Sequence, residues 1–356
     1  MMKQRLEKLR GFLQHNNLDA IIVSKPENRH YFSGFTGGDG ILVITLQTAD
    51  LITDFRYVEQ AGKEASCFTI VEHGRSLMEA VATVLKSNAI SCIGFEGDDF
   101  TYNDFTLLKM RLNGENVKAV GLDQLREVKD DREIALVRKA VEISDRAFSH
   151  ILTILRPGIT ERMVAAELEH VMRNLGSERP AFATIVASGV RSSLPHGLAT
   201  DKLLEIGDFV TMDFGAVYQG YHSDITRTVC IGKASAEQRK IYDIVLEAQL
   251  LGVNSVRPGE AGRKIDEIAR KLIMRYGYGK YFGHGLGHGV GLAIHELPRL
   301  SPSSQTEALT ANMLVTVEPG IYVPGFGGVR IEDTVLVTAD GAEVLTKSSK
   351  QLIEIE

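Results

Sequence analysis

The sequence repeats itself within its second half, and this repeat limits the folds that the chain can adopt. The segments "RPGIT" (156–160) and "RPGEA" (257–261) each follow one helical pattern and precede another, and "GDFVTMDFG" (207–215) is matched by "NMLVTVEPG" (312–320). The offset is 101 positions for the first pair of segments and 105 for the second. Motifs that recur at a nearly fixed offset indicate repeated structural units. We therefore predict two copies of a helix, helix, strand arrangement with a cleft between them.

The first 128 residues follow a different pattern. Short apolar runs rich in β-branched residues, such as "DAIIVS" and "GILVITL", alternate there with charged helical patterns such as "SLMEAVATVLKS". This alternation predicts a small α/β domain. A long amphipathic helix then begins, with Asp130 or Asp131 as its N-cap. We therefore predict an α/β protein with a domain at 1–128 and a pseudo-twofold α+β domain at 129–356.

Charge and cysteine content narrow the classes of partner. The 356 residues carry a net charge of -6, and no run of basic residues is available to neutralise a nucleic-acid backbone. The three cysteines are widely spaced and fit reduced thiols. No apolar run has membrane-spanning length, and the N-terminal residues lack the pattern of a signal peptide. We expect a cytoplasmic protein that binds neither nucleic acid nor membrane.

Two aspartates flank a predicted hairpin in the first copy of the repeat. In "VTMDFGAVYQGYHSDITRTV", a hairpin centred between Tyr218 and Gln219 would place Asp213 directly opposite Asp224. Opposite partners project from the same face, about 5 Å apart, and two such charges need a cation between them. The alternative is a bulge that turns one aspartate to solvent.

Two glutamates belong to strand patterns of the second copy. "MLVTVEPGIY" ends a strand at Glu318, and "GGVRIEDTVLVT" puts Arg330 and Glu332 on one face with Asp333 on the other. An unpaired ionised carboxylate costs several kcal/mol to bury, so each needs a partner or a metal ion. For Glu332 the alternative to a metal ion is a salt bridge with a neighbouring arginine.

The stretch "YFGHGLGHGVGLAIHE" (281–296) contains histidines among alternating glycines. It fits neither a GxGxxG nor a Walker phosphate-binding motif, and its glycines disfavour a helix, so His284 and His288 are not the helical pair of an HExxH metalloprotease. On an extended path the two histidines share a face, and the glycines would let a substrate or metal ion approach the backbone. A single histidine is more often structural, but together with four strand acids these histidines favour a metal site.

The predicted metal ligands are Asp213, Asp224, His288, Glu318 and Glu332. They offer one nitrogen and up to eight oxygen donors, which is enough for two divalent ions. So many oxygen donors favour Mn²⁺, with Co²⁺ and Zn²⁺ as alternatives. Two such ions can lower the pKa of a shared water and polarise a carbonyl, so the predicted chemistry is hydrolysis.

These motifs resemble the pita-bread metallopeptidases, which include methionine aminopeptidases, Xaa-Pro aminopeptidases and Xaa-Pro dipeptidases (prolidases). The matching motifs are "LPHG", "MDFGAVYQGYHSDITRT", "GHGLGHGVGLAIHE", "TVEPGIY" and "GVRIEDTV", in that order. In the first domain, "PENRHYFSGF" and "TDFRYVEQA" resemble the creatinase-type domain that methionine aminopeptidases lack. The resemblance implies a creatinase-like N-terminal domain, a pita-bread catalytic domain, and a peptide substrate with proline at its second position.

The resemblance also implies individual roles. Asp213 would bind the first metal ion, His288 and Glu318 the second, and Asp224 and Glu332 both. Glu318 would also carry the proton between water and the leaving nitrogen. Contacts to the substrate and transition state would come from His196, His284, His295 and Arg330. Arg299 resembles the arginine that in some prolidases holds the C-terminal carboxylate of the proline.

Several functions share this scaffold. Arg299 favours a dipeptidase, because an arginine bound to a free carboxylate would reject longer chains. An Xaa-Pro aminopeptidase is the alternative for longer peptides. A metal-free, creatinase-like hydrolase would dispense with the five ligands, and a non-catalytic peptide-binding module would have lost some of them. The resemblance further suggests a homodimer.

Overall fold

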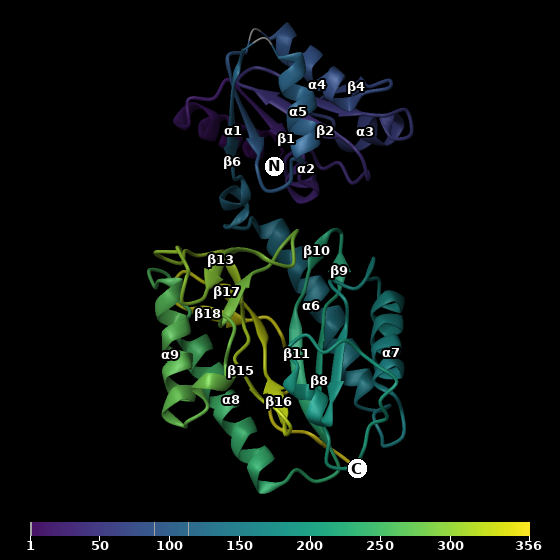
Figure 1. Ribbon diagram of the computed structural model, residues 1–356, viewed down its shortest axis with the longest axis vertical. Coiled ribbons are helices and arrows are strands. Elements are labelled where there is room, and N and C mark those ends of the chain that lie inside the picture. Colours follow the sequence, from purple (N-terminus) through teal and green to yellow (C-terminus); the bar gives the residue numbers. More distant parts are fainter. Residues whose placement is uncertain (1, 89, 113) are drawn as a thin grey trace. The chain divides into compact units, whose positions relative to one another are not determined.

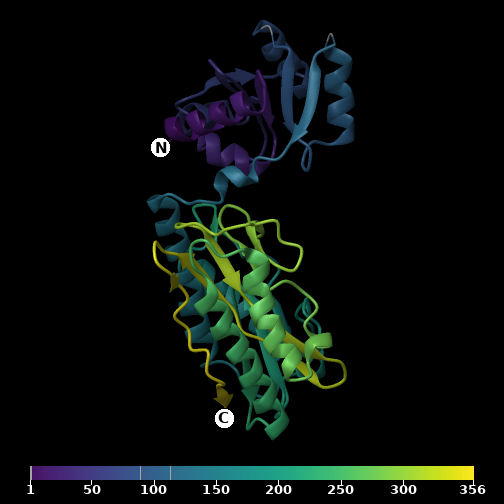
Figure 2. The ribbon, with the colours of Figure 1, turned by 90° about the vertical axis from the view of Figure 1, so that its left-hand side faces the viewer.

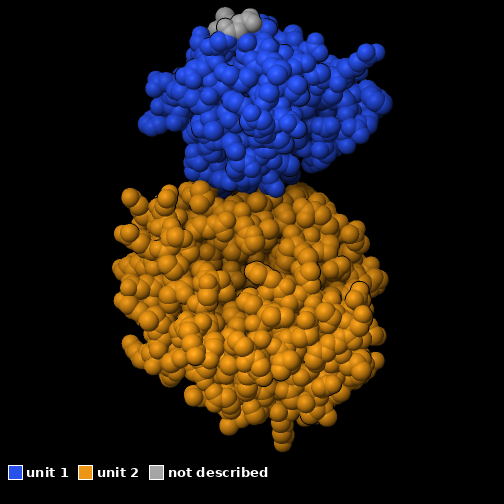
Figure 3. Space-filling view, viewed as in Figure 1, with its two compact units in different colours: residues 1–126 blue, residues 127–356 orange. Residues whose placement is uncertain are grey.

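The computed structural model describes residues 2–88, 90–112 and 114–356, and the chain divides into two compact units, Met1–Arg126 and Glu127–Glu356 (Figure 3). Each unit is considered by itself. The sequence-based boundary at residue 128 stays a prediction.

Unit 1 is an α/β domain, as predicted. Its mixed sheet has the strand order β4-β3-β2-β1-β5-β6, in which β1 runs antiparallel to β2 and parallel to β5. Side chains of α4 and α5 pack against apolar sheet residues such as Ile22 and Val43. The elements are α1 (Met2–His15), β1 (Ala20–Val23), α2 (Pro26–Ser33), β2 (Ile41–Thr45), β3 (Ala49–Thr53), α3 (Val58–Glu64), β4 (Thr69–Glu72), α4 (Leu77–Ser87), β5 (Cys92–Glu96), α5 (Tyr102–Arg111) and β6 (Asn116–Val120).

Unit 2 is built from two larger sheets, two two-stranded sheets (β10-β9 and β15-β16) and two pairs of α-helices (Figure 1). The helices are α6 (Asp131–Ile151), α7 (Glu161–Asn174), α8 (Ala236–Ser255) and α9 (Gly262–Arg275). One of the larger sheets has the order β19-β11-β8-β7 and the other has the order β13-β12-β14-β17-β18. The strands are β7 (Ile185–Ser188), β8 (Phe209–Phe214), β9 (Val217–Tyr218), β10 (Tyr221–His222), β11 (Ile225–Ile231), β12 (Gly287–Gly289), β13 (Glu296–Leu300), β14 (Leu314–Val317), β15 (Gly320–Val323), β16 (Gly327–Arg330), β17 (Asp333–Val337), β18 (Ala342–Val344) and β19 (Glu354–Ile355).

The predicted helix at the start of unit 2 is present with its N-cap at Asp130. The Asp130 carboxylate accepts the Glu133 N–H at 2.9 Å, and the Glu133 carboxylate accepts the Asp130 N–H at 2.9 Å, so the two residues form a capping box. Such reciprocal bonds satisfy backbone donors that the first turn of a helix leaves free. The sequence identified this helix start correctly because a cap depends on local chemistry alone.

The repeat is a structural repeat. Each Arg-Pro-Gly segment joins a pair of helices, α6 to α7 or α8 to α9, and its glycine has a positive φ, 87° at Gly158 and 85° at Gly259. The N–H of Gly158 donates to the carbonyl of Leu204, and that of Gly259 donates to the carbonyl of Leu309, each at 2.9 Å. In both halves, the turn is therefore hydrogen-bonded to an equivalent residue of the segment that follows.

The two halves exchange equivalent bonds where their sheets meet. The Thr228 hydroxyl donates to the carbonyl of Arg330 at 3.0 Å, and the Thr334 hydroxyl donates to the carbonyl of Asp224 at 2.9 Å. Donors and acceptors are both separated by 106 positions, as expected for residues related by a pseudo-twofold axis. The segments that carry Asp224 and Arg330 are therefore held against each other from both sides.

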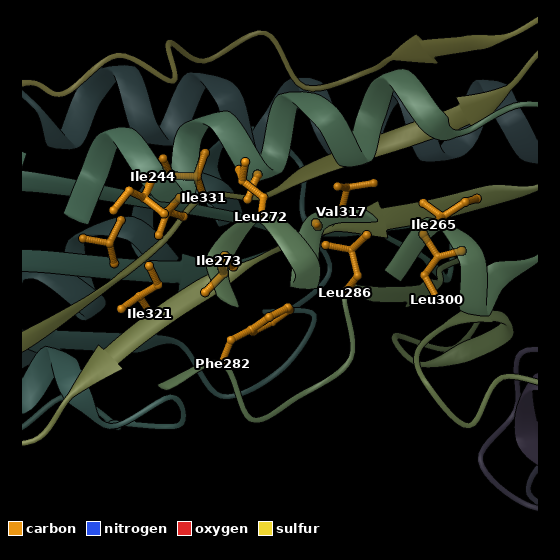
Figure 4. Close-up of a cluster of buried hydrophobic side chains, with 14 of the residues drawn as sticks. Ile244, Ile265, Leu272, Ile273, Phe282, Leu286, Leu300, Val317, Ile321 and Ile331 are labelled. Carbon is orange, nitrogen blue, oxygen red and sulfur yellow. The ribbon is translucent and has the colours of Figure 1, made fainter. Parts of the chain in front are cut away.

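The second half has an apolar core between its helices and its sheet. The helices α8 and α9 lie side by side (Figure 2). Their side chains, Ile244, Leu272 and Ile273 among them, form one cluster with Val317 of β14 and Leu286 (Figure 4). This core fixes the strand end that precedes Glu318. Among the described residues, no helix combines the length and the apolar character needed to cross a membrane.

Candidate metal centre

One cavity of about 680 Å³ within unit 2 is lined by every residue for which the sequence predicted a role. These residues are His196, Asp213, Asp224, His284, His288, His295, Arg299, Glu318, Arg330 and Glu332. They come from both halves of the repeat. The cleft expected between the two copies therefore exists, and the predicted ligands face into it together.

The predicted pairing of the two aspartates is wrong by two positions along the partner strand. Asp213 in β8 lies opposite Thr226, and the turn is centred between Gln219 and Gly220 rather than between Tyr218 and Gln219. Both turn residues have positive φ, 48° and 80°, as a two-residue hairpin turn of type I′ requires, and this turn sets the register.

Asp224 nevertheless shares the cavity with Asp213. It lies in the break between β10 and β11, two positions before Thr226, so it is a diagonal neighbour of Asp213 on the same face. Its side chain is buried, which excludes the alternative in which a bulge turns it to solvent.

His288 lies at the centre of the acid cluster. Its Nε2 is 3.5 Å from Asp224 Oδ2 and 3.4 Å from Glu318 Oε1, and ligand atoms of Asp224, His288 and Glu332 all lie within 4.8 Å of one another. Burial, with His295 as a smaller contributor, lowers the pKa of His288 to about 3, so the ring is neutral at pH 7. Its Nδ1 is 3.0 Å from the carbonyl of Gly289, which assigns the proton to Nδ1 and leaves the Nε2 lone pair facing the acids.

The pKa values of three carboxylates in this cluster are raised. Burial raises the pKa of Glu318 to about 8. Burial followed by neighbouring carboxylates raises the pKa of Asp224 and of Glu332. Glu332 accepts the Thr226 hydroxyl at 2.7 Å on Oε2, while its Oε1 and the Oδ1 of Asp213 are buried and accept no hydrogen bond. Within the described residues, no arginine forms a salt bridge with Glu332, which was the alternative left open by the sequence.

Arg330 is a cation that donates hydrogen bonds into the cluster. It donates from Nη2 to Asp213 Oδ2 at 2.6 Å and from Nε to the Thr226 hydroxyl at 3.0 Å, so Arg330 and Thr226 together connect Asp213 to Glu332. Asp333, next in sequence to Glu332, points the other way and pairs with Arg227 at 2.8 Å. The predicted division of Arg330 and Glu332 from Asp333 is confirmed.

Tyr322 and Thr226 belong to this site and were not singled out from the sequence. The Tyr322 hydroxyl accepts a hydrogen bond from Arg330 Nη1 at 2.7 Å and lies 2.9 Å from His284 Nε2. A signal was available, because Thr226 is two positions after Asp224 and therefore shares its face of the strand. A tyrosine at a strand end carries no comparable signal.

The glycine-rich stretch is not helical, as predicted, and Gly285 and Gly287 line the cavity, while some of its glycines also allow neighbouring strands to pack closely. A Cβ on Gly287 would overlap the carbonyl oxygen of Thr316 in β14, and one on Gly289 would overlap the carbonyl of Leu297 in β13. The missing side chains thus let β12 approach its two neighbours. His288 lies within β12, whereas His284 precedes it in a bend.

Two further predicted residues lie on the wall of the cavity. The ring of His295 packs edge-on against that of His288, with centroids 4.3 Å apart. Arg299 lines the same cavity, and within the described residues no carboxylate pairs with its guanidinium. A free cation on the wall of a peptide-sized cavity is suited to bind a carboxylate.

The donor set fits divalent cations. Several buried carboxylates face one another, two of their oxygens lack partners, and a neutral imidazole directs its lone pair at them. Buried charges of like sign persist only with a counter-charge, and Arg330 supplies only one. Metal ions on these oxygens would satisfy the unpartnered atoms and return the carboxylates to their ionised form.

Comparison with known proteins finds one family model for each unit. The family model "Metallopeptidase family M24" matches residues 135–339, and "Creatinase/Prolidase N-terminal domain" matches residues 5–128. An Xaa-Pro dipeptidase of Pyrococcus furiosus is 44% identical over 355 residues, which cover 99% of this chain and 100% of that protein.

Solved structures of similar proteins agree with the match to these two families. An Xaa-Pro dipeptidase from Bacillus anthracis has a TM-score of 0.97 at 46% identity, covering 99% of this chain and 100% of the other. An X-Pro aminopeptidase from Thermotoga maritima has a TM-score of 0.91 at 39% identity, covering 98% and 99%. The predicted fold class is therefore confirmed.

Proposed function

Since the chain belongs to metallopeptidase family M24, we propose that it is a metal-dependent exopeptidase that hydrolyses the bond before proline in Xaa-Pro dipeptides. The observation that carries this proposal is the convergence of the acid and histidine cluster with an unpaired arginine on one cavity. The dipeptidase relatives, similar over their whole length, support it.

We assign the metal-binding role to the five predicted ligands. Asp213 would hold one divalent ion, His288 and Glu318 the other, and Asp224 and Glu332 both. Oxygen donors dominate this set, which favours Mn²⁺. When bound, two such ions lower the pKa of a shared water and polarise the carbonyl of the scissile bond.

The remaining groups would handle the proton and the substrate. Glu318 would take a proton from the attacking water and deliver it to the proline nitrogen, which is a poor leaving group until protonated. His196 and His295, on the wall of the cavity, would stabilise the developing negative charge on the carbonyl oxygen. His284 and Arg330, which both contact the Tyr322 hydroxyl, would bind the substrate.

Arg299 is the basis for preferring dipeptides. Its guanidinium has no carboxylate partner in the described part of the chain and could form a bidentate pair with the free carboxylate of a C-terminal proline. A longer peptide has an amide at that position and would leave the arginine unpaired. The similarity to an X-Pro aminopeptidase keeps activity on longer peptides as the second candidate.

The experiment compares Xaa-Pro with Xaa-Pro-Yaa substrates on the manganese-loaded protein, in the wild type and in Arg299→Met. We expect the dipeptide to be preferred by kcat/KM, and the variant to lose that preference by raising KM for the dipeptide about tenfold or more. Preference of the wild type for the tripeptide would replace the dipeptidase by the aminopeptidase. Turnover of neither substrate by a metal-loaded protein would favour a binding module.

We also propose a homodimer in the cytoplasm. All three cysteines are free, which is compatible with a reducing compartment.

A further inference from the structure

A buried ion pair lies behind the segments that carry Thr226 and Glu332. These two residues are 106 positions apart, and the Thr226 hydroxyl donates to the Glu332 carboxylate at 2.7 Å. The next residues, Arg227 and Asp333, have the same separation and pair with each other at 2.8 Å, with side chains 1% and 0% exposed. Consecutive residues of an extended chain project to opposite sides. One pair of equivalent residues therefore faces the acid cluster, and the other lies behind it.

Arg227 bonds the backbone at the point where the two halves meet. The Glu332 N–H donates to the carbonyl of Thr226 at 3.1 Å, and Arg227 Nη1 donates to that same carbonyl at 3.0 Å. This Nη1 also donates to the carbonyl of Glu332. Because β11 and β17 belong to different sheets, their relative position depends on such individual bonds. The guanidinium therefore joins Thr226 to Glu332 through their backbones.

The guanidinium is itself held on its other side. Its Nη2 donates to Asp333 Oδ1 and to the carbonyl of Ser348, each at 2.8 Å, and its Nε donates to the carbonyl of Ser349 at 3.0 Å. All three nitrogens of Arg227 thus donate hydrogen bonds. Since a guanidinium is planar and rigid, these bonds fix its orientation against the two backbone carbonyls.

Asp333 has further partners that do not involve Arg227. Its Oδ2 accepts hydrogen bonds from Gln249 Nε2 at 2.8 Å and from Lys350 Nζ at 2.6 Å, and its Oδ1 accepts the Thr346 hydroxyl at 2.8 Å. Replacement of Arg227 therefore leaves this buried carboxylate with one cation and two neutral donors. The effect of Arg227 on the metal centre can be measured in a chain that still compensates the charge of Asp333.

We propose that Arg227 is a positioning residue, which holds the Glu332 carboxylate at the metal centre by bonding the carbonyls of Thr226 and Glu332 from behind. Replacement of residues that orient metal ligands typically weakens metal binding by about ten- to a hundredfold. This inference rests on the proposed function, because it gives Glu332 a part in binding metal ions. It predicts that loss of the Arg227 bonds weakens metal binding more than loss of another bond in the same ion network.

Isothermal titration calorimetry of the metal-free protein with Mn²⁺ tests this role. Arg227→Met removes every bond of the guanidinium, and we expect its affinity for Mn²⁺ to fall about tenfold or more. Arg227→Lys keeps a charge opposite Asp333, but one nitrogen cannot replace three, so we expect a similar fall in affinity with a smaller loss of stability. An affinity within about twofold of the wild type in either variant would overturn the proposal.

Two matched controls remove other partners of Asp333. Lys350→Met and Gln249→Met each delete one bond to Asp333 Oδ2 and leave the bonds of Arg227 in place. We expect both controls to lower the free energy of unfolding, measured in urea, and to keep the affinity for Mn²⁺ within about twofold of the wild type. If the controls lose as much affinity as the Arg227 variants, general destabilisation explains the loss and the proposal is wrong.

Hydrogen exchange of the metal-free protein gives a readout that needs neither metal ions nor turnover. The Glu332 N–H donates to the Thr226 carbonyl that Arg227 also bonds. Exchange of residues 331–335 should therefore accelerate about tenfold in both Arg227 variants and stay near the wild-type rate in both controls. Unchanged exchange in the Arg227 variants would show that the guanidinium does not hold this backbone.

The two proposals fail separately. A wild type that binds Mn²⁺ without cleaving Xaa-Pro dipeptides would make the proposed function wrong, and the affinities would still decide the role of Arg227. A wild type that cleaves the dipeptides, together with Arg227 variants of unchanged affinity, would overturn the positioning role alone. A wild type that binds no Mn²⁺ would overturn both.

Discussion

At the scale of single residues, the carboxylates of the metal centre destabilise the metal-free fold but provide the ligands that the proposed chemistry needs. The buried carboxylates of Asp224 and Glu332 and the partly buried carboxylate of Glu318 lie close together, and the pKa of each is raised. Such a cluster is stable as an ionised group only with bound cations. The predictions at this scale therefore concern protons and metal ions.

Asp224→Asn keeps the shape of the side chain and removes one bridging carboxylate. We expect the variant to lose bound metal and to lose kcat/KM on the order of a thousandfold, because the remaining ligands no longer neutralise two dications. Its metal-free form should unfold no more easily than that of the wild type, since a repulsive charge is gone. Elemental analysis, turnover and thermal unfolding check this, and a variant with full metal content and full turnover would exclude the bridging role.

From the raised pKa of Glu318 we predict that the free energy of unfolding of the metal-free protein depends on pH. The Glu318 pKa of about 8, raised by burial from the usual 4.5, means that the folded chain binds more protons than the unfolded chain between pH 4.5 and 8. The free energy of unfolding must then fall as pH rises through this window. His288, with its pKa lowered to about 3, has the opposite effect, but only below about pH 6.5.

The measurement is denaturant unfolding of metal-free protein from pH 6.5 to 8.5. The wild type should lose stability across this range, and Glu318→Gln should lose less, because Gln does not titrate. Glu318 also raises the pKa of Asp224 and of Glu332, so Glu318→Gln lowers those pKa values and reduces the loss of stability further, in the same direction. Parallel pH profiles would contradict the raised pKa.

The sequence pointed to the ten residues that line the cavity in two ways: the strand acids and His288 belong to motifs whose chemistry is explicit, whereas His196, His295 and Arg299 were indicated by the family resemblance alone. The roles of Tyr322 and Thr226 could not be predicted, since a hydroxyl becomes part of such a site only through the neighbours that the fold supplies. Arg330 shows both cases: its strand face was predictable, whereas its bond to Asp213 was not.

At the scale of elements, the turns and close strand contacts decide the geometry. The sequence predicts a hairpin here with its two acids directly opposite each other, whereas the chain follows the turn that Gly220 permits. Local backbone chemistry therefore determined the register, and the acids were brought together as diagonal neighbours instead of opposite ones. The signal was present in the sequence as a glycine at the second turn position.

The close packing of glycines in the stretch 281–296 predicts that a side chain added in β12 destabilises the protein. Gly287→Ala places a Cβ against the carbonyl of Thr316 and should destabilise the protein by about 1–3 kcal/mol, with a loss of metal affinity as His288 moves. Gly283→Ala is the matched control, because nothing lies within 4 Å of a Cβ there, and it should change stability by less than about 0.5 kcal/mol. Urea unfolding of both variants checks this; equal effects would show that the close approach of β14 is unimportant.

At the scale of the whole molecule, the internal repeat explains why a metal site forms. Asp213 and Glu318 occupy equivalent positions at the ends of β8 and β14, and the pseudo-twofold relation brings both into one cavity. The sequence predicted this arrangement because the repeat survives in two motifs. The lining of the cavity beyond those motifs depends on packing between the halves, which no local pattern encodes.

The oligomeric state is a prediction at this scale. A homodimer should sediment at about twice the 39.1 kDa of one chain at micromolar concentration. A mass of one chain at that concentration would contradict the dimer and leave the metal site unaffected.

The most direct test of the account is an anomalous-scattering map of crystals grown from manganese-loaded protein. We predict two peaks, about 3.5–4 Å apart, among Asp213, Asp224, His288, Glu318 and Glu332. A map without anomalous density at these residues, from protein that hydrolyses Xaa-Pro dipeptides, would contradict the claim that the buried acids exist to hold metal ions.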